Sequence, residues 1–171
     1  MTPHSPDPAE ASGGRFRDGM ARLGAAVNVV TSDGPAGRLG FTASAVCSVS
    51  DQPPTLLLCM NRRSTQNGPL RENGVFCVNS LAADQRPLSE VFAGLAGLAM
   101  PERFAAASWA ALATGSPVLD GASASFDCEV LSVTEVATHS VIVGKVLAVQ
   151  VGDTPSGLVY FGREYHAMSV A

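Results

Sequence analysis

Small hydroxyl side chains recur at alternate positions in residues 40–50, which have the sequence GFTASAVCSVS. Successive side chains of a β-strand point to opposite faces, so such a strand would carry its hydroxyls on one face. The hydroxyl residues of that face are Thr42, Ser44, Ser48 and Ser50. Neutral donors and acceptors suit a bound, uncharged ring with hydrogen-bonding groups, although an ordinary Ser/Thr-rich edge strand explains the pattern equally well.

The glycines at Gly34, Gly37 and Gly40 do not form a dinucleotide-binding loop. That loop follows a strand, has the spacing GxGxxG and opens a helix, whereas the residues after Gly40 predict a strand. The sequence also contains no P-loop, GxSxG or HExxH motif. An enzyme without an evident acid, base or nucleophile is best explained by a cofactor that carries the reaction.

The four cysteines have no Cys-x-x-Cys spacing, and the three histidines are dispersed along the chain. We therefore expect no metal site. Each cysteine lies in an apolar, strand-like segment, which predicts reduced, buried and structural thiols. The residues concerned are Cys47, Cys59, Cys77 and Cys128.

The composition predicts one domain that binds small molecules or proteins. The chain has 171 residues, 46% hydrophobic residues and a mean hydropathy of +0.21, which is enough for a substantial core. Only 15% of residues are charged and the net charge is −4, so no electrostatic footprint for nucleic acid or an anionic membrane is present. The low charge fraction predicts that one face is buried against a second subunit, giving a homodimer.

Residues 1–14 contain three prolines and a glycine pair but no apolar core of a secretory signal. We expect a disordered tail over residues 1–14, a single domain over residues 15–171 and a cytoplasmic protein. No apolar run approaches the roughly 20 residues needed to span a bilayer.

Apolar periodicity predicts a mainly β fold with a few short helices. A turn at residues 33–38 would join the first strand to the hydroxyl strand, and Pro53 and Pro54 would end the latter. Strands are expected over residues 25–32, 40–50, 55–61, 75–81, 125–133, 139–151 and 158–161. Helices are expected over residues 16–23, within 64–73 and over 84–92, the last capped by Asp84. Residues 93–121 are expected to form a loop with a short helix. This pattern favours a closed or nearly closed antiparallel barrel with Greek-key connections over a doubly wound α/β fold.

Several segments together resemble the short-chain flavin reductase family, whose members share a split β-barrel that binds flavin. The segments are GFTASAVCSVSDQPPTLLLCMNRRST, FCVNSL, HSVIVGKV and LVYFGREYH, between about residues 16 and 166. The resemblance implies reduction of FMN or FAD by NADH or NADPH, and delivery of reduced flavin to a separate flavin-dependent monooxygenase. It leaves FMN against FAD open, and the lack of a basic cluster beyond Arg62 and Arg63 favours NADH.

The family pattern implies two sets of flavin contacts. The ring would be bound through side chains and backbone amides of Thr42, Ala43, Ser44, Val46 and Ser48. The phosphate or ribityl chain would be bound by Asn61, Arg62, Ser64 and Thr65. Alternatively, Arg62 and Arg63 belong to a solvated turn, and Ser64 caps a helix, which is compatible with phosphate binding at the helix N-terminus.

His139 lies where the family binds nicotinamide, although the usual Gly-Asp-His is here Ala-Thr-His; a surface or capping role is the alternative. The flavin pocket would be closed by Arg163, Tyr165 and His166, either of the same subunit or of the neighbouring one. Alternatively, these residues form a surface turn that an aromatic side chain anchors to the domain. Asn79 is either a satisfied buried polar group or a cofactor contact.

Phe104 and Trp109 either cover the flavin or fill the barrel end, and packing is the commoner role of large aromatic side chains. The implied reaction is hydride transfer from nicotinamide C4 to flavin N5, which needs positioning and hydrogen-bond donors but no protein nucleophile. The rival hypotheses are a non-catalytic flavin or haem carrier on the same barrel and a pyridoxal-type amine oxidase on a related barrel.

Overall fold

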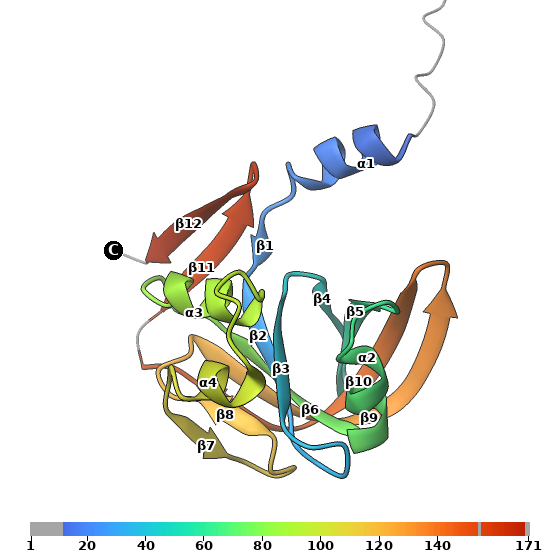
Figure 1. The fold of residues 1–171 in the computed structure, drawn as a ribbon, viewed down its shortest axis with the longest axis vertical. Coiled ribbons are helices and arrows are strands. Elements are labelled where there is room, and N and C mark those ends of the chain that lie inside the picture. Colours follow the sequence, from blue (N-terminus) through green and yellow to red (C-terminus); the bar gives the residue numbers. More distant parts are fainter. Residues whose placement is uncertain (1–11, 154, 170–171) are drawn as a thin grey trace, which may run out of the picture.

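The computed structural model describes residues 12–153 and 155–169, so most of the predicted tail lies outside the described residues. Helix α1 (Gly13–Met20) begins two residues inside that predicted tail and three residues before the predicted helix start. The reason is Ser12, whose Oγ accepts a hydrogen bond from the Arg15 backbone N–H at 3.3 Å and so caps the helix. No α1 residue is buried, and Figure 1 shows the helix extending away from the rest of the fold.

The main sheet has seven antiparallel strands in the order β3-β2-β6-β9-β10-β5-β4. Its strands are β2 (Asn28–Ser32), β3 (Leu39–Ala43), β4 (Val46–Asp51), β5 (Pro54–Asn61), β6 (Val75–Ser80), β9 (Ala124–Val136) and β10 (His139–Val151). The predicted hairpin between the first strand and the hydroxyl segment is confirmed by the β2–β3 pairing.

The two edge strands of this sheet, β3 and β4, are consecutive in the chain and are separated by only Ser44 and Ala45. Consecutive Cα atoms are 3.8 Å apart, so Ala43 and Val46 lie within about 11 Å of each other. The sheet must therefore curl until its edges meet, and it does so without pairing β3 to β4. The predicted mainly β, split-barrel architecture is confirmed, whereas the prediction of one continuous strand over residues 40–50 is wrong (Figure 1).

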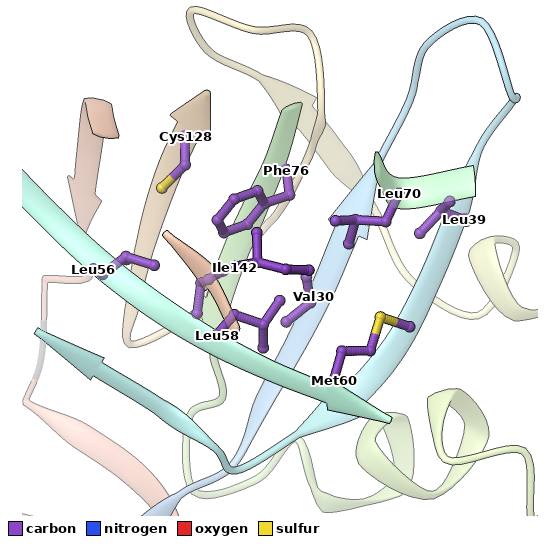
Figure 2. Packing of buried hydrophobic residues seen from close by; sticks show 10 residues of the cluster. Val30, Leu39, Leu56, Leu58, Met60, Leu70, Phe76, Cys128 and Ile142 are labelled. Atoms are coloured by element: carbon purple, nitrogen blue, oxygen red, sulfur yellow. The ribbon is translucent and has the colours of Figure 1, made fainter. Parts of the chain in front are cut away.

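The barrel interior holds the larger apolar core. Figure 2 shows side chains of β2, β5, β6 and β10 converging, among them the fully buried Val30, Leu58, Phe76 and Ile142. Along β5 only alternate residues are buried, so the prediction that both faces of this strand are buried is wrong within this chain. Helix α2 (Asn67–Asn73) adds the buried Leu70 to the core and ends, as predicted, at a left-handed Gly74.

A second apolar cluster packs β2 against the helices α3 (Arg86–Phe92) and α4 (Met100–Phe104). Gln85, rather than Asp84, precedes α3. The region predicted as loop and short helix also contains the short paired strands β7 (Trp109–Ala111) and β8 (Pro117–Leu119). The rings of Phe92, Phe104 and Trp109 pack edge to face in this cluster.

The predicted first strand is divided between two sheets. Residues Ala25–Ala26 form β1, which joins β11 (Ser156–Phe161) and β12 (Glu164–Ser169) in a three-stranded sheet, while the chain continues as β2 in the barrel. β12 occupies residues for which a surface turn was one of the two alternatives in the sequence analysis. The β11–β12 turn has positive φ at both Gly162 (61°) and Arg163 (68°), as a two-residue hairpin turn requires. Among the described helices, none is long and apolar enough to cross a membrane.

Candidate functional site

Two adjoining cavities lie where the barrel fails to close. The first, the β3–β4 cavity, has a volume of about 280 Å³ and is lined by Phe41, Thr42, Ala43, Ser44, Ala45, Cys59, Met60, Asn61, Ser64, Phe92 and Ala93. The second, the tyrosine cavity, has a volume of about 190 Å³ and is lined by Val27, Thr42, Ala43, Ser44, Ala93, Tyr160 and Tyr165. The two cavities share Thr42, Ala43, Ser44 and Ala93, so they lie side by side.

Two larger hollows, of about 430 and 420 Å³, lie elsewhere and share Asp84. Their linings include Asp120 and Asp153 and none of the residues that the family resemblance implies. Carboxylates repel the phosphates of flavin and nicotinamide nucleotides, so we place the candidate site at the smaller cavities.

Of the predicted ring-binding residues, Thr42, Ala43 and Ser44 line both cavities. The Thr42 hydroxyl donates a hydrogen bond to the Ser89 carbonyl of α3 at 2.6 Å, so its oxygen is left as an acceptor toward the cavity. Ser44 is exposed at the break between the strands. The structure therefore brings half of the predicted hydroxyl face to one place.

Val46 and Ser48 line a different cavity, of about 320 Å³, together with Phe126, Val146 and Val149. The predicted single hydroxyl face is therefore wrong. Ser44 and Ala45 are not in a strand, so the alternation of β3 does not continue into β4.

The predicted phosphate-binding segment forms a tight turn between β5 and α2. The Asn61 side-chain oxygen accepts from the Arg63 N–H at 2.9 Å, and the Ser64 N–H donates to the Asn61 carbonyl at 3.0 Å. Ser64 Oγ accepts from the Gln66 N–H at 3.3 Å, but Gln66 is the residue that precedes α2, so Ser64 is not the helix cap. Asn61 and Ser64 line the β3–β4 cavity, whereas the exposed Thr65 does not.

The two arginines of this turn differ in their surroundings. Arg62 forms an ion pair with Glu135 at 2.9 Å and donates to the Ala137 carbonyl at 3.3 Å. Glu135 also pairs with Arg71 at 3.2 Å. In the described part of the chain, the exposed Arg63 side chain makes neither an ion pair nor a hydrogen bond, which leaves Arg63 as the arginine available to an anion.

His139 is exposed at the start of β10 and lies opposite Asn61 in the β10–β5 ladder. Its Nδ1 lies 2.9 Å from the Thr138 hydroxyl. Directly opposed residues point to the same face of a sheet, so His139 is a neighbour of the cavity-lining Asn61 without itself lining either cavity.

Of the three predicted C-terminal residues, only Tyr165 reaches the site. Arg163 pairs with Asp18 of α1 at 2.6 Å, and the His166 Nε2 lies 3.1 Å from the Phe161 carbonyl oxygen. His166 is adjacent to Tyr165 in β12 and therefore points to the opposite face, whereas Arg163 lies in the β11–β12 turn.

Asn79 has the structural role that the sequence analysis offered as one alternative. It is fully buried, and its side-chain oxygen accepts from the Leu119 N–H and the Ser125 hydroxyl, each at 2.9 Å. Phe104 and Trp109 line neither cavity. Phe104 is 6% exposed, and its backbone carbonyl accepts a hydrogen bond from the Trp109 indole N–H at 2.9 Å.

The cysteines do not share one environment. Cys77 and Cys128 are buried as predicted. Burial raises the pKa of both thiols, that of Cys128 to about 12, and the negative charge of Asp127 acts in the same direction. The prediction is wrong for Cys47, which is exposed, and Cys59 is only half-buried and lines the β3–β4 cavity. Over residues 12–153 and 155–169, no cluster of potential metal ligands is found.

The sequence analysis missed the apolar wall of the site. Phe41, Met60, Phe92 and Ala93 line the β3–β4 cavity and would pack against a planar ring. The one available signal was Gly40, where a Cβ atom would lie 2.6 Å from Phe92 Cε1, so that only glycine lets α3 approach β3 this closely.

The fold is the split barrel of flavin reductases, and residues 20–169 match the model of the flavin reductase like domain. The chain belongs to this family. Among its curated relatives is the FMN reductase (NADH) RutF of Stutzerimonas stutzeri, which is 54% identical over 90% of this chain and 87% of the relative. RutF of Cronobacter sakazakii is 56% identical over 90% of this chain and 92% of its own length.

Solved structures agree with this assignment. A protein described as a flavin reductase from Haemophilus somnus 129pt superposes with a TM-score of 0.88 at 43% identity, covering 92% of this chain and 100% of that one. BorF, the flavin reductase component of a bacterial two-component tryptophan halogenase, has a TM-score of 0.86 at 30% identity, covering 94% of this chain and 100% of its own.

Proposed function

We propose that this protein is an NADH-dependent flavin reductase that binds FMN at the β3–β4 cavity and releases reduced flavin to a separate monooxygenase. The observation that carries the proposal is the convergence of Thr42, Ser44, Asn61 and Ser64 on a cavity with an apolar wall. The curated relatives named FMN reductase (NADH), which cover nine tenths of this chain, support the choice of FMN and NADH.

The lining suits the two ends of FMN differently. Phe41, Met60 and Phe92 offer apolar contact to a planar ring, and the Thr42 and Ser44 oxygens can hydrogen-bond its polar edge. At the other side, Asn61 and Ser64 lie in the turn that carries Arg63, and a guanidinium is well suited to phosphate oxygens. We assign ring binding to the first group and phosphate binding to the second.

The bound flavin supplies the redox chemistry, because it accepts a hydride from NADH. The residues of this chain hold the two substrates in contact and keep water from the apolar wall. β3 and β4 each pair with a neighbour on one side only, so unpaired backbone groups also face the break and can stabilise charge on the ring edge. No residue of this chain is assigned a covalent or proton-transfer step.

The deciding experiment measures NADH oxidation by the purified protein through the nicotinamide absorbance band, with FMN and FAD each tested against NADH and NADPH. Turnover that is fastest with NADH and FMN is expected. Flavin binding without NADH oxidation would favour a carrier on the same barrel and would sink the proposal. Delivery of reduced flavin is tested by adding the oxygenase component of a two-component monooxygenase and keeping it physically separate from the reductase. Faster hydroxylation by the oxygenase is expected if free reduced flavin passes between the two proteins.

We further propose that the protein is a cytoplasmic homodimer. The apolar side of α1 and the following turn is exposed, with Phe16 at 64%, Met20 at 48% and Leu23 at 59%. Full burial of such side chains stabilises an interface by roughly 1.5–3 kcal/mol each. The barrel exposes further apolar residues at Leu131, Leu147, Val149 and Val151.

The mass of the wild-type protein in light scattering is expected to be that of two chains. Phe16→Asp should shift it toward one chain at the same concentration, because an interface would have to bury the carboxylate. Arg15→Asp, on the same helix but off its apolar side, is the matched control and should remain dimeric. A wild-type protein that has the mass of one chain at assay concentrations would contradict the dimer.

A further inference from the structure

The tyrosine cavity is a separate hollow beside the proposed flavin position. It touches the β3–β4 cavity through Thr42, Ala43, Ser44 and Ala93 and extends from there to Val27, Tyr160 and Tyr165. Its volume of about 190 Å³ is smaller than that of its neighbour, and no lysine, arginine or acidic residue among residues 12–153 and 155–169 lines it. It is therefore suited to a small uncharged ring rather than to a phosphate.

The two tyrosines are held in fixed positions. Tyr160 of β11 and Tyr165 of β12 are directly paired across the hairpin, with ring centroids 5.3 Å apart and planes at 65°. The Arg86 guanidinium lies 5.1 Å from the Tyr165 ring centroid and forms an ion pair with Glu90 at 3.0 Å. A side chain with ordered neighbours loses little further entropy when a ligand arrives, so Tyr165 is pre-organised for binding.

The chemistry of this lining recognises planar heteroaromatic rings. Aromatic side chains interact favourably with a second ring in edge-to-face or offset geometry. Val27 adds apolar contact at the same cavity. A ring seated here lies next to any ring in the β3–β4 cavity, because the two hollows have part of their walls in common.

We propose that the tyrosine cavity binds a ring of the nicotinamide dinucleotide, with Tyr165 as its positioning residue. This inference rests on the proposed function and adds the place of the second substrate to it. Nicotinamide and adenine are both planar heteroaromatic rings that fit the description. His139 stands apart, since it lies beside Asn61 and lines neither cavity.

The test compares Tyr165→Leu with Tyr165→Phe. The first variant keeps apolar volume and removes the aromatic ring, and the second keeps the ring. Tyr165→Leu is expected to raise the KM for NADH roughly twofold to tenfold, the value of one aromatic pair, and to leave the FMN Kd from fluorescence quenching unchanged. Tyr165→Phe should stay within about twofold of the wild type.

Met168→Ala is the matched control, because Met168 is on the same strand and 55% exposed. It should change neither constant. Repeating the assay with reduced nicotinamide mononucleotide, which lacks adenine, separates the two rings. A raised KM for the mononucleotide places nicotinamide in the cavity, and a raised KM for NADH alone places adenine there.

The inference is overturned if Tyr165→Leu weakens FMN or FAD binding while the KM for NADH stays constant, since the cavity would then belong to the flavin. It is also overturned if no constant changes. If Tyr165→Leu fails to fold, Tyr160→Leu removes the partner ring, and the same outcomes decide. Failure of the proposed function is distinguishable, because the wild-type protein would then not oxidise NADH with any flavin.

Discussion

Replacement of Thr42 by valine separates the structural role of its hydroxyl from a role in binding. The hydroxyl donates to the Ser89 carbonyl at 2.6 Å and ties β3 to α3 beside the β3–β4 cavity. Valine has nearly the same shape and no hydroxyl. Thr42→Ser is the matched control, because serine keeps the hydroxyl and loses only the methyl group.

The expected loss of folding stability is modest. A hydrogen bond contributes a net 0.5–1.5 kcal/mol, roughly, and the Ser89 carbonyl keeps a second partner in the Ala93 N–H at 2.9 Å. We therefore expect Thr42→Val to lower the free energy of unfolding by about 1 kcal/mol and Tm by about 2–4 °C. Thr42→Ser should lose less.

Flavin affinity should fall as well, because the Thr42 oxygen is available to the cavity only as an acceptor. Loss of one ligand hydrogen bond predicts a rise of roughly twofold to tenfold in the FMN Kd. Fluorescence quenching measures Kd, and thermal unfolding followed by circular dichroism measures Tm. A lower Tm with unchanged Kd would show that the hydroxyl only fastens α3, and equal losses in Thr42→Ser, which keeps the hydroxyl, would refute a hydroxyl-specific role.

Three further outcomes are expected. Gly40→Ala should destabilise the protein by about 1–3 kcal/mol in urea unfolding, since its Cβ would lie 2.6 Å from Phe92 Cε1, whereas Gly68→Ala in α2, with nothing within 4 Å, should not destabilise it. Arg63→Gln should raise the Kd for FMN roughly tenfold and leave the Kd for riboflavin, which lacks the phosphate, unchanged. Arg62→Gln should change neither Kd much, because Arg62 already pairs with Glu135. Equal effects of Arg63→Gln on both flavins would refute a phosphate contact. The raised pKa values of Cys77 and Cys128 stabilise the folded state fully below the unfolded thiol pKa near 9.0. As pH rises from there toward about 12, stability should fall by about 1.4 kcal/mol per pH unit for each thiol, and Cys128→Ala should lessen this slope in urea unfolding.

The long barrel strands could be predicted because their periodicity is strong. β10 (His139–Val151) has the predicted bounds, and β9 (Ala124–Val136) extends the predicted strand by one residue at its start and three at its end. β7 and β8 have three residues each, too few for alternation to be visible. β12 is mostly exposed and polar, and it is a strand because β11 pairs with it along its whole length.

The candidate site was only partly accessible to sequence reasoning. Thr42, Ser44, Asn61 and Ser64 do meet, but no glycine or proline at Ser44 and Ala45 announces the break that turns β4 away. The position of Val46 and Ser48 at a different cavity follows from that break. Phe92 comes from a helix whose contact with β3 is a tertiary feature, and pairing of Arg62 with Glu135 depends on the β9–β10 hairpin.

The break at Ser44 and Ala45 also explains why the site lies where it does. A closed barrel would pair the backbone groups of β3 with those of β4 and leave no polar edge for a ligand. Here the chain passes from one sheet edge to the other in two residues, and the β3–β4 cavity lies along the end of β3 and this connection. Curling around the apolar core brings the edges together, and Gly40 lets Phe92 approach to close the cavity from the side. The same packing that stabilises the barrel thus creates a groove with a polar rim and an apolar wall, which is the combination that a flavin ring requires.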